Sequence, residues 1–242
     1  MMPKNYKKFR KDILQIYKEL NLSLDSNEED RTISNAIKLV DEYSIAPSAT
    51  YNFPAASGFY GDRELKISPS YYPFKISYVA LGGNADDILL KQLNPVPRIY
   101  KFTSGRSHIR YMVIRMGLKT DIGKNPILLY PKYFSWKLFA FLNSLFGSPV
   151  IPQKTNFTEL DKKYVTSFRE NQKWFLSSID YDIVEKLAGL ELPKTAGSIF
   201  QFSKNHATFS IVPGSIGINK IKAILEILYK FSKNIEKKYP NT

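Results

Sequence analysis

Cations, hydroxyl groups and a histidine gather in one short segment of this sequence, residues 101–110. Its centre, Thr-Ser-Gly-Arg-Ser-His at 103–108, reads as a small glycine-containing turn. In such a turn, backbone N–H groups and a guanidinium bind phosphate or carboxylate oxygens. The spacing is not that of a nucleotide-binding loop, and an ordinary surface hairpin turn is the alternative. The residues that we predict to bind an anion or a nucleic acid are Lys101, Arg106, His108 and Arg110.

Residues that catalysis requires do not converge anywhere along the chain. Adjacent acids at 28–30 and 86–87 stand at the starts of expected helices, where carboxylates stabilise the helix dipole. Serine-hydrolase, zinc and dinucleotide motifs are missing, and two histidines without cysteine do not supply a zinc ligand set. A small hydrolase or transferase would have to use Asp62, His108 and Arg106. The sequence therefore favours a non-enzymatic protein with no catalytic residue, no metal and no cofactor.

The net charge of +13 is the strongest global feature of this 242-residue chain. The excess of lysine and arginine lies in residues 1–20, 98–124 and 216–242. Such a distribution favours an anionic partner, which is a nucleic acid, an acidic protein or an acidic lipid surface. A lysine-rich solvated surface without a specific partner is the alternative.

The sequence also bears on the compartment. Cysteine is absent, so disulfides and thiolate metal sites cannot form. The first residues lack the apolar core of a signal peptide. The most apolar run, residues 133–146, is shorter than the about 20 apolar residues that span a bilayer. We therefore predict a cytoplasmic protein without a transmembrane segment, with peripheral attachment to a membrane as the alternative.

Residues 133–146 are expected to form a helix that is apolar nearly all round, with a narrow polar stripe at Lys137 and Ser144. Such a helix lies in a core, under a partner, or in a membrane interface. The buried or partner-covered arrangement is favoured, because an interfacial helix usually has a wide cationic face. If the helix is covered by a partner or lies in a membrane interface, Trp136 and Phe139 are the predicted contacts.

The N-terminal half divides into a helical and a strand-rich region. Apolar residues at helical spacing predict helices over 4–20 and 28–43, separated by a polar break at 21–27, and thus a helical hairpin. A helix-turn-helix is the alternative. From residue 48 onward, short runs between Pro, Gly and Ser predict strands, and residues 57–61 read as a turn with aromatics. The predicted strands cover 64–68, 74–81, 98–102 and 109–118, the last being central because both its faces are mainly apolar.

The C-terminal part follows a proline-containing connection at 148–157. We predict a strand at 163–167 and a short helix at 172–177. A second helix is predicted to be capped by Asp180 and to end at a left-handed Gly189. A hairpin of 199–202 with 207–212 precedes a long basic helix whose apolar stripe faces inward. The fold class is α+β, with helices packed on a mixed or antiparallel sheet. The regions 1–47, 48–147 and 148–242 are expected to form one compact domain.

The order of these elements resembles the DUF3137-type family of uncharacterised prokaryotic proteins. The resemblance rests on residues 160–167 (LDKKYVTS) and 183–187 (IVEKL), and on the mixed aromatic and cationic strand 110–115 (RYMVIR). Asp161, Tyr164 and Val165 stand where that family has an acid followed by an aromatic strand start. The resemblance spans roughly residues 57–238 and implies an α+β fold. It implies nothing catalytic.

Taken together, the sequence predicts a non-enzymatic binding or adaptor protein whose basic surface takes an anionic ligand or an acidic partner. A nucleic-acid- or ribosome-associated protein that uses the cations of residues 101–110 is the first alternative. A peripheral membrane protein attached through residues 133–146 is the second, and a small hydrolase or transferase the third.

Overall fold

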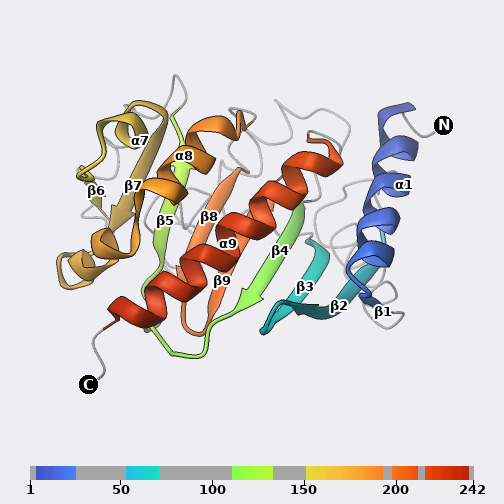
Figure 1. Cartoon of the computed structure of the whole chain (residues 1–242), viewed down its shortest axis with the longest axis horizontal. Coiled ribbons are helices and arrows are strands. Elements are labelled where there is room, and N and C mark those ends of the chain that lie inside the picture. The colour runs from blue at the N-terminus through green and yellow to red at the C-terminus, as the bar shows by residue number, and fades with distance from the viewer. Residues whose placement is uncertain are drawn as a thin grey trace, which may run out of the picture.

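The computed structural model describes residues 4–25, 53–70, 111–132, 151–192, 198–211 and 216–239. Over these ranges the chain forms one large antiparallel sheet with helices packed against it (Figure 1). The predicted α+β class is therefore confirmed.

Every strand of the described sheet pairs antiparallel with its neighbours, in the order β1-β2-β3-β4-β9-β8-β5-β7-β6. The hairpin β8–β9 occupies the middle and connects the early strands β1–β4 to the later group β5, β7 and β6. The strands are β1 (Ser23–Asp25), β2 (Ala55–Tyr60), β3 (Arg63–Ser70), β4 (Tyr111–Gly117), β5 (Ile127–Pro131), β6 (Ile151–Gln153), β7 (Tyr164–Phe168), β8 (Ile199–Ser203) and β9 (His206–Ile211).

One face of the sheet carries the hydrophobic core. The strand register places Ile114 opposite Phe209, and Phe209 opposite Phe200, so that these buried side chains share a face. Alternation along each strand then turns the intervening residues to the second face. Strand β4 has a partner on both sides, β3 and β9, which confirms that it is a central strand.

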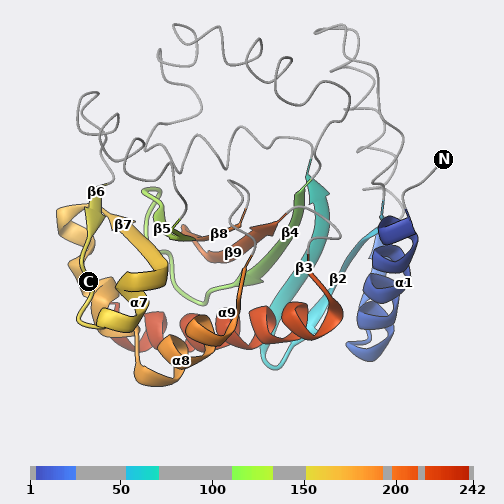
Figure 2. The same cartoon turned by 90° about the horizontal axis from the view of Figure 1, so that it is seen from above.

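The helices that cover this core face come from both ends of the chain. Figure 2 shows α8 and α9 on the same side of the sheet, with α1 at the end of the sheet formed by β1 and β2. A 3₁₀ segment, η1, packs against α9. The bounds are α1 (Lys4–Glu19), α7 (Thr158–Lys163), η1 (Glu170–Ser178), α8 (Tyr181–Gly189) and α9 (Ile218–Lys238).

The long C-terminal helix α9 crosses the strands as its apolar stripe predicts. Residues at helical spacing are fully buried along it, including Ile221, Leu228 and Ile235. Its Phe231 ring stacks on Phe175 of η1 at 5.7 Å and lies 4.8 Å from Phe202 of β8. These contacts join a helix, a 3₁₀ segment and a strand that are distant in sequence.

Several local predictions are corrected by the structure. Residues 57–60 belong to strand β2 rather than to a turn, because Phe59 and Tyr60 pair with β3 and only Gly61 and Asp62 turn the chain. The polar break at 21–27 contains β1, and the connection at 148–157 contains β6; both are short edge strands. Gly189 ends α8 as expected, but it does not adopt a left-handed conformation.

Some predictions fall outside the described residues. These are the second N-terminal helix at 28–43, the strands 74–81 and 98–102, and the apolar helix 133–146. The helical hairpin therefore stays a prediction, and so does the division into regions. Within the described ranges, no helix combines the length and apolar character needed to cross a bilayer.

Candidate functional site

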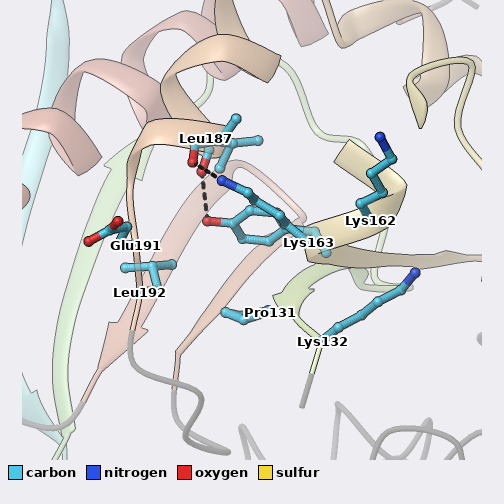
Figure 3. A pocket seen from close by; sticks show the side chains of 9 residues that line it. Pro131, Lys132, Lys162, Lys163, Leu187, Glu191 and Leu192 are labelled. Carbon is cyan, nitrogen blue, oxygen red and sulfur yellow. Dashed lines mark hydrogen bonds between the residues drawn. The ribbon is translucent and has the colours of Figure 1, made fainter. Parts of the chain in front are cut away.

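A small pocket opens beside the last turns of α7 and α8, where β5 ends and β7 begins (Figure 3). It has a volume of about 320 Å³, at the small end of the range of about 300–1,000 Å³ that ligand pockets occupy. One wall is apolar and the rim is mainly cationic. The lining residues are Pro131, Lys132, Lys162, Lys163, Tyr164, Leu187, Ala188, Glu191 and Leu192.

Two consecutive residues tie this pocket to the end of α8. Helix α7 ends at Lys163 and the chain enters β7 at Tyr164 without a loop, so both side chains reach α8. The Lys163 ammonium donates to the carbonyl of Ala188 at 2.6 Å, and the Tyr164 hydroxyl donates to that of Leu187 at 3.0 Å (Figure 3). The Lys163 bond satisfies a carbonyl of the last helical turn, where intrahelical partners are missing. The Tyr164 bond adds a second donor to the Leu187 carbonyl, which also accepts the backbone N–H of Leu190.

Lys132 closes the other side of the pocket. Its backbone N–H donates to the carbonyl of Lys163 at 2.8 Å, and its ammonium donates to the carbonyl of Asp161. The Asp161 carboxylate in turn accepts bonds from the backbone N–H and the hydroxyl of Thr155, at 3.1 and 2.9 Å. Because the backbone around Asp161 is fixed in this way, Lys132 has a defined position.

Lys162 differs from the other two lysines. Its ammonium pairs with Glu159 one turn earlier, at 2.7 Å, and its side chain is 63% exposed. In Figure 3 it extends away from the bond that Lys163 makes to α8. The cations held at fixed places are therefore Lys132 and Lys163.

The pocket combines cationic hydrogen-bond donors with an apolar wall. An ammonium has three N–H donors, and the Lys163 ammonium uses one of them on the carbonyl of Ala188, so it has donors for an anion. Lys132 adds a second positive charge at the rim. The Tyr164 hydroxyl stays protonated, because burial raises the pKa of Tyr164 above its ordinary value. In the described part of the chain, His, Asp and Glu side chains do not gather in a group that would hold a metal ion.

A second polar cluster joins the β2–β3 turn to α9. The Arg63 guanidinium, 2% exposed, makes two bonds to the carboxylate of Glu236, one of them at 2.5 Å. Glu236 also accepts the backbone N–H of Lys119 at 2.6 Å. Asp62 accepts from the ammoniums of Lys119 and Lys233, at 2.7 and 2.8 Å.

These bonds keep Asp62 ionised near neutral pH. Hydrogen bonds from Lys119 and then Lys233 hold the pKa of Asp62 far below its ordinary value. A carboxylate in that state does not exchange protons near neutral pH, so it does not serve as a general acid or base. We interpret this cluster as a clamp between the hairpin and the helix.

Most residues that the sequence singled out lie outside the described ranges: Lys101, Arg106, His108, Arg110, Trp136 and Phe139. Asp62 is described, and its partners are lysines and a tyrosine of other elements. The sequence reasoning did not find the pocket. The available signal was the pair Lys162-Lys163 directly before an expected strand; nothing local indicates that Lys132 or Leu192 lies beside it.

The fold and the pocket define an α+β protein with a lysine-rimmed cavity at one end of its sheet. No model of a known protein family matches the chain, and no curated protein matches it. The resemblance to the DUF3137-type proteins therefore stays a prediction.

Among solved structures, the chain is similar to the crystal structure of the mycobacterial trehalose monomycolate transport factor A, TtfA. The two are 9% identical, and the match covers 98% of this chain and 99% of that one, with a TM-score of 0.48. At this TM-score and identity, the similarity carries no argument about a shared role.

Proposed function

We propose that this protein is a non-enzymatic binding protein, and that its pocket takes a small ligand with an anionic head and a short apolar body. The observation that carries the proposal is the placement of Lys132 and Lys163 around an apolar wall. The ammoniums would hold a carboxylate, sulfonate or phosphate, while Leu187 and Leu192 would contact the apolar part.

The charge balance of the pocket supports an anion. Three lysines line it against one acid, Glu191, and Lys162 is already paired with Glu159 outside the lining. The carbonyl ends of α7 and α8 oppose an anion, but their exposed carbonyls at Asp161 and Ala188 are covered by the lysine ammoniums. The anion would therefore meet N–H donors rather than helix carbonyls.

The test uses octanoate and 1-octanol, which share an alkyl chain and differ in the charge of the head. Calorimetric titration of the full chain is expected to show saturable binding of octanoate that is at least about 10-fold tighter than that of 1-octanol, because only the carboxylate gains charge-assisted hydrogen bonds. Lys163→Met keeps an apolar stem and removes the ammonium, so it should abolish most of this difference.

Two further variants decide whether the pocket is the site. Ala188→Phe fills the cavity without changing charge and should abolish binding of both probes. Lys173→Met removes an exposed lysine of η1 that pairs with Glu170, and it should leave binding unchanged. Equal binding of octanoate and 1-octanol, or octanoate binding that survives Ala188→Phe in a folded protein, would overturn the proposal.

A further inference from the structure

The N-terminal helix α1 packs by one face and presents the other to solvent. Phe9, Ile13 and Ile16 lie on the packed face and are at most 3% exposed, and Tyr17 on the same side is 2% exposed. The Tyr17 hydroxyl donates to the carbonyl of Pro54 at 3.0 Å, which fixes the helix against the start of β2. The orientation of α1 is thus set, and its outer face is a defined surface.

That outer face is cationic, and its cations have no acidic partner within the part of the chain that the structure describes. With 100° between successive residues, Arg10, Leu14 and Lys18 form one row along the helix, and Lys11 and Lys8 continue around the exposed side. All of these side chains are exposed. Glu19 is already paired with Lys222 of α9 at 2.7 Å. We call Lys8, Arg10, Lys11, Leu14 and Lys18 the outer face of α1.

The composition of the outer face favours a lipid surface over a single-stranded nucleic acid. Proteins that bind single strands stack bases on aromatic side chains, but the aromatic residues Phe9 and Tyr17 of this helix are buried. An aliphatic side chain is exposed instead: Leu14, at 38%, lies between Arg10 and Lys18 on successive turns. Long cationic side chains around an exposed aliphatic residue suit the boundary between headgroups and acyl chains.

We propose that the outer face of α1 docks the protein on an anionic lipid bilayer. Lys8, Arg10, Lys11 and Lys18 contact the acidic headgroups, and Leu14 enters the boundary region. Since the apolar stripe of α1 is buried in the protein, the attraction is mainly electrostatic and reversible. This surface lies at the β1–β2 edge of the sheet, opposite the end with the lysine pocket (Figure 1), so it does not depend on the function proposed for that pocket.

The experiment is co-sedimentation of the full chain with vesicles of phosphatidylcholine, with and without about one-third phosphatidylglycerol. Binding is expected only to the anionic vesicles, and it should be lost between about 0.1 M and 1 M salt, where the Debye length falls from about 10 Å to about 3 Å. Lys11→Gln/Lys18→Gln should weaken binding about 25-fold, at about 5-fold for each cation removed. Leu14→Gln should weaken it further.

The matched control is Lys237→Gln/Lys238→Gln, which makes the same change in net charge at exposed residues of α9. It should retain nearly full binding, as should Lys163→Met in the pocket. Equal losses in the two double variants would overturn the proposal, because the attraction would then come from net charge alone. It would also be overturned if Trp136→Glu abolished binding while the α1 variant did not, or if α1 governed binding to duplex or single-stranded DNA and not to vesicles.

Discussion

At the scale of single residues, opposite charges meet where the β2–β3 turn touches α9. Arg63 and Glu236 are 173 positions apart and form a two-bond pair whose guanidinium is 2% exposed. Removing one partner of a buried pair is strongly destabilising because it leaves an uncompensated charge. Arg63 is therefore a cation with a structural role, and because Glu236 neutralises it, this pair adds nothing to the net charge of +13.

The neighbouring Asp62 determines how the unfolding free energy changes at acid pH. Hydrogen bonds from Lys119 and then Lys233 lower its pKa in the folded state, while the unfolded value stays near about 3.9. The contribution of Asp62 to the unfolding free energy is therefore complete above its pKa in the unfolded state. It is lost as the pH falls toward its pKa in the folded state. The difference in unfolding free energy between the wild type and Asp62→Asn should be constant above about pH 5 and shrink below about pH 4.

Urea unfolding at a series of pH values measures this difference. In a Lys119→Met/Lys233→Met background the same Asp62→Asn change should produce a much smaller effect at neutral pH, since the ammoniums that favour the carboxylate are gone. A difference that grows as the pH falls would contradict the assignment.

At the scale of elements, the β2–β3 turn depends on a glycine for two separate reasons. Gly61 has φ of +61°, and a Cβ atom there would lie 2.9 Å from Cε2 of the Tyr229 ring. Gly123 also has a positive φ, +88°, but nothing lies within 4 Å of the place of its Cβ. Both positions carry backbone strain for an L-residue, and only the first adds a steric clash.

Gly61→Ala should therefore destabilise the protein more than Gly123→Ala. The shared backbone strain costs about 1–2 kcal/mol, and the excess for Gly61 measures how far Tyr229 must move. Thermal and urea unfolding of the two variants give this excess directly. Equal losses would show that the Tyr229 ring moves aside without cost.

Elements with a strong local pattern were predictable. The apolar stripe of α9, the hairpin β8–β9 and the cap of α8 all follow from neighbouring residues, and the Asp180 carboxylate does accept the backbone N–H of Ile183 at 2.9 Å. The short strands β1 and β6 were missed, because three residues show no period and their pairing depends on distant partners. Strand β2 was missed because it contains Gly58, a residue that sequence rules assign to turns. Here the glycine allows a close approach of Leu22, whose Cδ2 would lie 2.8 Å from a Cβ at this position.

At the scale of the whole molecule, the candidate sites come from non-local pairing. Strand β5 lies between β7 and β8, which brings Leu129 beside both Thr166 and Phe200. The same arrangement carries Lys132, at the end of β5, to the backbone of Lys163. The sequence predicted a strand at 163–167, which corresponds to β7, but it predicted no strand at β5 and no pairing between the two. The pocket follows only from their being neighbours.

The same topology predicts cooperative unfolding. The two groups of strands meet only through β8–β9 in the described sheet, and α9 crosses both groups, with Phe231 packed on Phe175 and Phe202.

Phe231→Ala should cost about 3–5 kcal/mol of unfolding free energy, because it opens a cavity where three elements meet. Phe59→Ala is the matched control: Phe59 is 65% exposed, and its loss should cost at most about 0.5 kcal/mol. Urea unfolding in a Trp136→Phe background reports on Trp174 of η1 by fluorescence and on the whole chain by circular dichroism. The two transitions should coincide in both variants, since a break in the Phe231 contacts lowers the stability of all the elements that α9 joins; transitions that separate in Phe231→Ala would mean that the strand groups fold independently.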